Sequence, residues 1–160
     1  MEWLNAIVQG TLLGGLYALF AAGLSLIFGV MRLVNIAHGD LIVLAAYLGL
    51  TTTVVLGLHP LLALVVVVPA MAGIGYVLQR GVLNQTLGTD ILPPLLVTFG
   101  LSVIIQNALL EGYSADPQKM DAGALETASI GLGPLAIGVL PLLTFAIAVG
   151  VIAGLQWTRS

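Results

Sequence analysis

The sequence contains no cysteine and very few charged residues. Lysine and arginine number 4 and aspartate and glutamate 7, so that charged residues make up 7% of 160, against roughly 25% in a typical soluble domain. Without cysteine, a disulfide framework and a thiolate metal site are excluded. Four basic residues cannot form a nucleic-acid-binding surface, so nucleic acid is excluded as a partner.

The common catalytic motifs are also missing. The chain has no G-x-x-x-x-G-K-[ST] loop and its single lysine, Lys119, lies among acidic residues, so we do not expect it to hydrolyse ATP. The run Gly100-Leu101-Ser102-Val103 is not completed by the final glycine of the G-x-S-x-G nucleophile elbow. We therefore expect a protein that is not an enzyme and that carries neither a cofactor nor a metal.

Long uncharged stretches take the place of those features. Residues 3–31, 41–79, 91–110 and 127–158 contain no aspartate, glutamate, lysine or arginine, and each reaches the roughly 20 residues that span a bilayer as a helix. Their hydrophobicity is continuous, whereas the strands of a membrane barrel alternate. The sequence thus predicts an all-α, polytopic bundle of transmembrane helices.

The second stretch is about twice the spanning length. Gly57-Leu58-His59-Pro60 lies in its middle and predicts a tight hairpin, with Pro60 in the first turn of a new helix. His59 is then a surface residue to which we assign no role. We expect a single transmembrane domain over residues 1–160, with an acidic loop over 112–132 and five helices, over 4–31, 36–56, 61–79, 93–111 and 133–157.

The positions of the arginines indicate an orientation. Arg32, Arg80 and Arg159 fall in alternate connections or at the end of the chain, so the positive-inside rule places them in the cytoplasm. The N-terminus and the acidic loop are then predicted outside and the C-terminus inside.

Small residues recur every four positions along the first and last helices. Such strips allow another helix backbone to approach closely, which in lipid replaces the hydrophobic drive for association. Packing within the bundle is the favoured interpretation, and a dimer interface is the alternative. The residues are Gly10, Gly14, Ala18 and Ala22 in the first helix and Ala146, Gly150 and Gly154 in the last.

Polar side chains cluster between the first two helices, at Asn35, His38 and Asp40, and Gly39 lies between the last two. One interpretation is helix capping, with Asn35 as N-cap and Asp40 near the positive end of the helix dipole. The other is a break in the helices that gates a pathway or lines it for a polar substrate.

A second polar group lies on one predicted helix. Thr98, Ser102 and Gln106 are four residues apart and share a face, and Asn107 is adjacent. They could form interhelical hydrogen bonds, worth roughly 0.6 kcal/mol each, or an uncharged stripe that guides a zwitterion. Because the acidic residues fall in loops or at helix ends, a proton- or ion-coupled carrier is not favoured.

Several runs in the chain are similar to those of one family. The sequence resembles the branched-chain amino acid ABC transporter permeases, and the related urea and amide permeases share the pattern. The resemblance covers most of the chain and is carried by Gly15-Leu16-Tyr17-Ala18-Leu19, Gly23 to Met31, Asn35 to Asp40 through Ala46-Tyr47, and Thr98 to Ser102 with Gln106-Asn107.

The resemblance implies a multi-pass subunit of the bacterial or archaeal inner membrane that forms the path for branched-chain or related amino acids. Its implied partners are a second permease subunit, two cytoplasmic ATPases, an external substrate-binding protein and the lipid bilayer. Family members are nearly twice as long, and their coupling loop begins near Trp157, so we expect an incomplete permease domain. A urea or amide permease and a non-transporting membrane scaffold are the alternatives.

Overall fold

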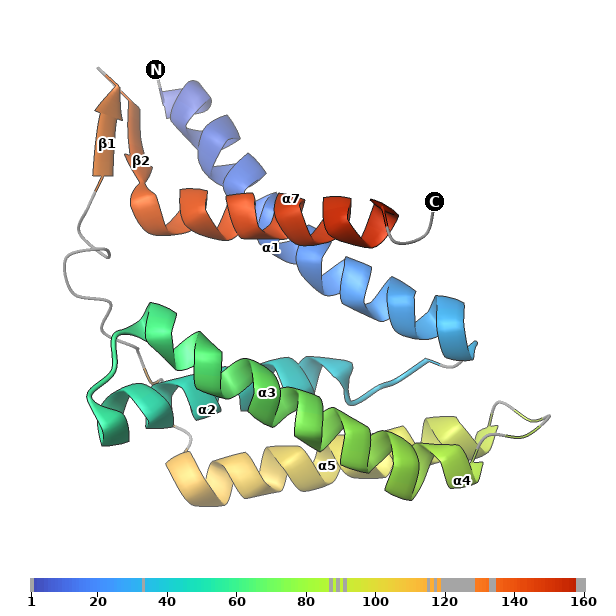
Figure 1. The fold of residues 1–160 in the computed structure, drawn as a ribbon. Helices are drawn as coiled ribbons and strands as arrows, with labels where there is room; N and C mark the ends of the chain where they lie inside the picture. The colour runs from blue at the N-terminus through green and yellow to red at the C-terminus, as the bar shows by residue number, and fades with distance from the viewer. Residues whose placement is uncertain are drawn as a thin grey trace. The chain divides into compact units, whose positions relative to one another are not determined.

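The computed structural model describes residues 2–32, 34–86, 88, 90, 92–114, 116, 118, 129–132 and 135–157. Over these residues the chain is mainly helical (Figure 1), which confirms the predicted fold class. The helices are α1 (Glu2–Met31), α2 (His38–Leu56), α3 (Pro60–Leu78), the π-helical η1 (Gln79–Leu83), α4 (Asn84–Thr86), α5 (Leu92–Tyr113) and α7 (Val139–Trp157).

Within the described ranges, four helical segments are long and apolar enough to cross a membrane. They are Trp3–Val30, His38–Leu56, Pro60–Thr86 and Leu92–Tyr113, and α7 contains a shorter apolar segment, Pro141–Gly154. Many of their exposed side chains are apolar: Val54 is 73% exposed and Val65 72%. A surface of this kind is suited to lipid.

The chain divides into two compact units. Met1–Leu26 and Ala122–Ser160 form one, and Ile27–Asp121 form the other. The second unit contains α2, α3 and α5 and holds the polar residues singled out above.

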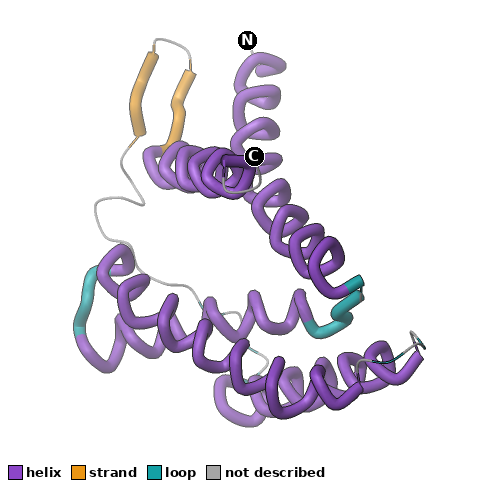
Figure 2. Tube along the Cα trace, turned by 45° about the vertical axis from the view of Figure 1, so that its right-hand side comes forward, coloured by secondary structure: helices purple, strands orange, loops and turns teal. Residues whose placement is uncertain are grey.

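Residues 57–59 connect α2 to α3 and confirm the predicted hairpin (Figure 2). Gly57 ends α2 with φ at +61°, a left-handed conformation that glycine adopts without steric cost. Pro60 occupies the first turn of α3, and the exposed His59 caps that helix because its Nδ1 accepts from Leu61 N at 3.3 Å. His59 is therefore a surface residue, as expected, with a capping role.

The helical trace beyond α3 extends further than predicted. Helix α3 ends at Leu78, next to the expected end at residue 79, but η1 and α4 continue the helical trace to Thr86. The Arg80 guanidinium donates to the Tyr76 hydroxyl at 2.5 Å and lies 5.9 Å from that ring's centroid. The Arg80 charge is thus held against the side of its own helix.

Helices α2 and α5 run parallel with a constant register. Three side-chain contacts join residues 62 positions apart: Ile36 to Thr98, Asp40 to Ser102, and Thr51 to Tyr113. Because Ser102 lies ten residues after Leu92 and eleven before Tyr113, the first turn of α2 packs beside the middle of α5. Residues 35–37 lie beside its first half.

The first unit contains a feature that the sequence did not predict. Strands β1 (Ser129–Leu132) and β2 (Leu135–Gly138) pair antiparallel, with Ser129 opposite Gly138 and Leu132 opposite Leu135 (Figure 2). The prediction of a helix from residue 133 and a loop through 132 is therefore wrong at this boundary, since α7 begins at Val139.

Candidate functional site

A network of three hydrogen bonds in the second unit joins the two polar groups that were predicted separately. The Ser102 hydroxyl donates to Asp40 Oδ2 at 2.5 Å, and the Gln106 amide donates to Asp40 Oδ1 at 3.0 Å and to Ser102 Oγ at 3.2 Å. Ser102 is buried, while Asp40 is partly exposed. The carboxylate from α2 is thus held by two neutral donors from α5.

The segment that leads into α2 is held by the same helix. The Ile36 backbone N–H donates to the Thr98 hydroxyl at 3.3 Å, and that hydroxyl donates to Leu95 O at 3.1 Å. Thr98 and Ala37 are fully buried. Non-helical backbone beside a membrane helix requires such partners, because lipid supplies none.

Asn35 completes the junction, but not as the predicted N-cap. The cap position of α2 is Ala37, which makes no side-chain cap bond. The side chain of the buried Asn35 instead accepts a hydrogen bond from Ala37 N at 3.0 Å. The backbone carbonyl of Asn35 accepts a second one from His38 N at 3.2 Å. Asn35 therefore stabilises the turn that precedes α2, and the helix begins at His38, two residues later than predicted.

Asp40 lies near the end of its own helix, as expected, but beside the middle of another helix. Asp40 is in the first turn of α2, yet its partners Ser102 and Gln106 lie in the middle of α5. Among the described residues, no basic side chain forms an ion pair with it. Ionisable groups within membrane-spanning segments are costly, and they mark polar pathways in membrane proteins.

An open groove of about 310 Å³ runs along the two helices from this carboxylate. Its lining is Asp40, Val43 and Tyr47 from α2, with Gln106, Leu109, Leu110 and Ser114 from α5 or just beyond it. The polar groups come first along both helices, and the aliphatic side chains follow. The groove therefore offers a carboxylate and an apolar wall together.

Aromatic side chains lie at the far end of the paired helices. The rings of Tyr47 and Tyr113 have centroids 4.5 Å apart, and the Tyr113 hydroxyl is hydrogen-bonded to Thr51 Oγ1. Tyr47 also lines the groove. These contacts fix the register of α2 and α5 at the end opposite the junction.

The remaining predicted pathway residues are His38, Gly39 and Asn107. His38 is half-buried in the first turn of α2, and Gly39 is exposed. The Asn107 amide donates to Val103 O of its own helix at 2.8 Å. Their predicted role in gating or in the substrate path stays a prediction.

The predicted small-residue strips make little contact within the described residues. A Cβ placed on Gly10, Gly14, Gly150 or Gly154 would meet nothing within 4 Å, and Ala18 is exposed while Ala22 is half-buried. The close contact is at Gly15, which is buried and where a Cβ would overlap the Phe145 ring of α7. Packing of the strips against other surfaces stays a prediction.

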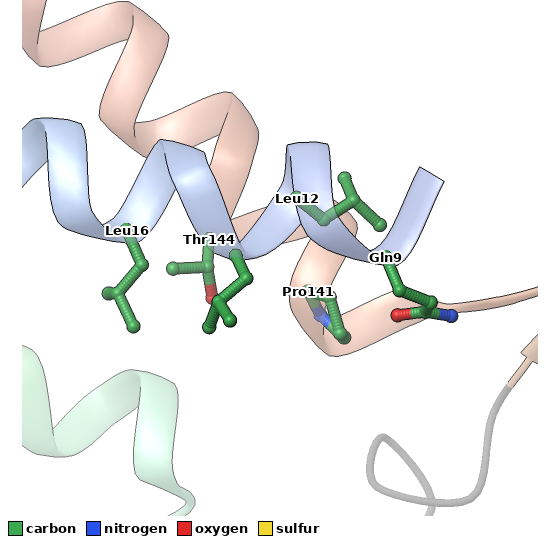
Figure 3. Close-up of a pocket in the computed structure, with 6 residues that line it drawn as sticks. Gln9, Leu12, Leu16, Pro141 and Thr144 are labelled. Carbon is green, nitrogen blue, oxygen red and sulfur yellow. The ribbon is translucent and has the colours of Figure 1, made fainter. Parts of the chain in front are cut away.

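A second pocket, of about 350 Å³, lies in the first unit (Figure 3). Leu12, Leu13 and Leu16 of α1 supply most of its lining, together with Gln9, Pro141 and Thr144. Its lining within the described part of the chain includes no charged side chain, so it is a poorer match for a polar substrate than the groove at Asp40.

Sequence reasoning missed the groove residues Val43, Tyr47, Leu109 and Leu110. The sequence did contain a pattern that indicates these residues. Val43 lies three positions after Asp40, and Tyr47 four positions after Val43; Leu109 and Leu110 lie three and four positions after Gln106. Such spacing places residues on one helix face. Extending each polar group along its own face would have identified the aliphatic neighbours.

Comparison with known proteins finds a family match over the part of the chain that contains the junction and the groove. Residues 6–121 match the family model of the branched-chain amino acid transport system permease component. The high-affinity branched-chain amino acid transport system permease protein BraD of Pseudomonas aeruginosa is 24% identical over 96% of this chain and 54% of its own length. The corresponding protein LivH of Salmonella typhimurium is 24% identical over 70% of this chain and 40% of its own.

The chain therefore spans about half the length of these curated relatives, or less. No solved structure matches it. The family match extends over α1, α2, α3 and α5, and so includes the junction, Asp40 and the groove. On this evidence the chain belongs to the family of branched-chain amino acid transport system permease components.

Proposed function

We propose that this chain forms part of the transmembrane path of an ABC-type importer for branched-chain amino acids, and that the Asn35–Asp40 junction with Thr98, Ser102 and Gln106 lines that path. The observation that carries the proposal is the carboxylate of Asp40 beside the middle of α5, bonded by Ser102 and Gln106 and open to a groove. A packing role alone would not require a charge at that depth.

The relatives' names supply the substrate class, since both are described as branched-chain amino acid permeases. A permease component works with other parts of its transport system. We assign it a second permease subunit, two cytoplasmic ATPases that supply the energy, and an external protein that delivers the substrate.

Uptake by the complete transporter tests the path. Gln106→Ala removes the amide donors to Asp40 and Ser102 from a side chain that is exposed, so it should leave packing intact. We expect uptake of leucine by proteoliposomes to fall by more than tenfold, which corresponds to about 1.4 kcal/mol of barrier.

The matched control is Val103→Ala, which truncates an exposed side chain three residues away on α5. It should transport normally, and both variants should yield the same amount of assembled complex. Normal uptake by Gln106→Ala would contradict the proposal, and a loss of uptake in proportion to a loss of complex would indicate a structural role.

A further inference from the structure

Asp40 is a charged group with unused bonding capacity. A carboxylate has about four acceptor sites, and Ser102 and Gln106 occupy one on each oxygen. Both donors are neutral, and no ion pair compensates the charge within the described part of the chain. A carboxylate at membrane depth is stabilised when a cationic group completes its environment.

The groove beside it fits a cation of a particular kind. Val43, Leu109 and Leu110 continue the lining beyond Asp40 and Gln106, so a bound molecule meets a carboxylate and an aliphatic wall. The volume of about 310 Å³ is at the lower end of ligand pockets, which run from roughly 300 to 1,000 Å³. A small molecule with an ammonium group and an aliphatic side chain matches both features.

We propose that Asp40 is the specificity-determining residue of this groove and binds the primary ammonium group of the transported molecule, while Val43, Leu109 and Leu110 contact its aliphatic part. This inference rests on the proposed function and adds the group that the groove recognises. Molecules of the same shape without an ammonium group, including uncharged amides, bind poorly because they leave the carboxylate unpaired.

Protection of an engineered cysteine tests this directly, because the chain contains none. Leu110→Cys places a thiol on the groove wall, and its labelling by a water-soluble thiol reagent is followed in the complete transporter, with all other subunits free of cysteine. No external binding protein is added, so that the result reports on this groove alone. The probes are 3-methylbutylamine, 4-methylpentanoate and 4-methylpentanamide at equal concentration.

The amine should slow labelling at least fivefold, and the acid and the amide should have little effect. In the double variant with Asp40→Asn, which keeps the side chain's size but removes its charge, protection by the amine should be lost, and Asp40→Glu should restore it in part. Asp90→Asn removes an exposed carboxylate elsewhere and should leave protection unchanged.

Equal protection by acid and amine, no protection by the amine, or protection that survives Asp40→Asn would each overturn the inference. The comparison of the three probes needs no Asp40 variant and decides the matter even if Asp40→Asn does not assemble. A thiol at position 110 that water-soluble reagents never reach would instead refute the proposed function, since the groove would not be open to water.

Discussion

Gly14 and Gly15 are neighbours on α1 with different surroundings. A Cβ on Gly14 would meet open space, whereas one on Gly15 would overlap the Phe145 ring. The four-residue spacing of small residues predicted a packing role for Gly14. Such spacing shows which helix face has small side chains, but it does not show which residue of another helix contacts that face. The partner of Gly15 is a residue 130 positions away in the chain, and no local pattern reveals it.

Gly15→Ala should therefore destabilise the protein, while Gly14→Ala should not. The added methyl group forces the Phe145 ring to move, and overpacking of this kind costs about 1–3 kcal/mol. Thermal unfolding of the purified chain in detergent measures the difference. Adding Phe145→Leu should restore much of the stability of Gly15→Ala, and equal stability of the two single variants would show that α1 and α7 do not make this contact.

Some properties of Asp40 could be predicted from the sequence, and its position relative to α5 could not. The sequence identified Asp40, Ser102 and Gln106 as polar residues worth attention, and it placed Asp40 correctly near the start of a helix. The sequence contains no direct indication of the register between that helix and α5, that is, of which residues of α5 lie beside Asp40. The 62-residue register depends on packing between distant segments, so the depth of the carboxylate emerged only from the structure.

Among the elements, the hydrophobic pattern predicted the long helices well because uncharged length is a direct requirement of the bilayer. The hairpin of β1 and β2 was missed because residues 127–158 form one uncharged stretch. The dipeptide Gly133-Pro134 in that stretch is a turn signal, and it could have divided the stretch before α7. The continuation of α3 into η1 was missed because Arg80 was taken to mark its end.

The junction before α2 depends on one hydroxyl of α5. Thr98→Val keeps the shape of a fully buried side chain and removes the acceptor for Ile36 N–H. An unsatisfied donor costs about 1–3 kcal/mol, so we expect a loss of stability in that range, measured by thermal unfolding in detergent.

Thr52→Val is the matched control for that experiment. Its hydroxyl donates only to Leu48 O of its own helix, at 2.7 Å, and its removal should change the stability by less than half as much. If both variants lose the same amount, then Thr98 contributes no more to the junction than an ordinary helix threonine does.

At the scale of the whole molecule, family membership and the spanning helices make the chain a multi-pass protein of the bacterial inner membrane. The parallel direction of α2 and α5 agrees with two spans that are separated by one other span, α3. The structure contains no membrane, and the side on which each loop lies stays a prediction.

Single cysteines test that orientation. Ser114→Cys, just beyond α5, should be labelled by an impermeant thiol reagent added to intact cells, because the acidic loop is predicted outside. Gly88→Cys, between α4 and α5, should be labelled only after the membrane is opened. The opposite pattern would mean that the topology is inverted; both residues are exposed, so accessibility within the fold does not limit either reaction.

The depth of Asp40 has an electrical consequence. With the predicted orientation, the groove opens outward and its carboxylate lies beside the middle of a spanning helix. A unit charge that crosses the whole membrane changes its energy by about 2.3 kcal/mol per 100 mV. If the field falls evenly, an ammonium group that moves from the outer surface to Asp40 crosses about half of that potential. The occupancy of the groove by a molecule whose only charge is its ammonium group then rises as the cell interior becomes more negative, whereas a zwitterionic amino acid carries no net charge across the field.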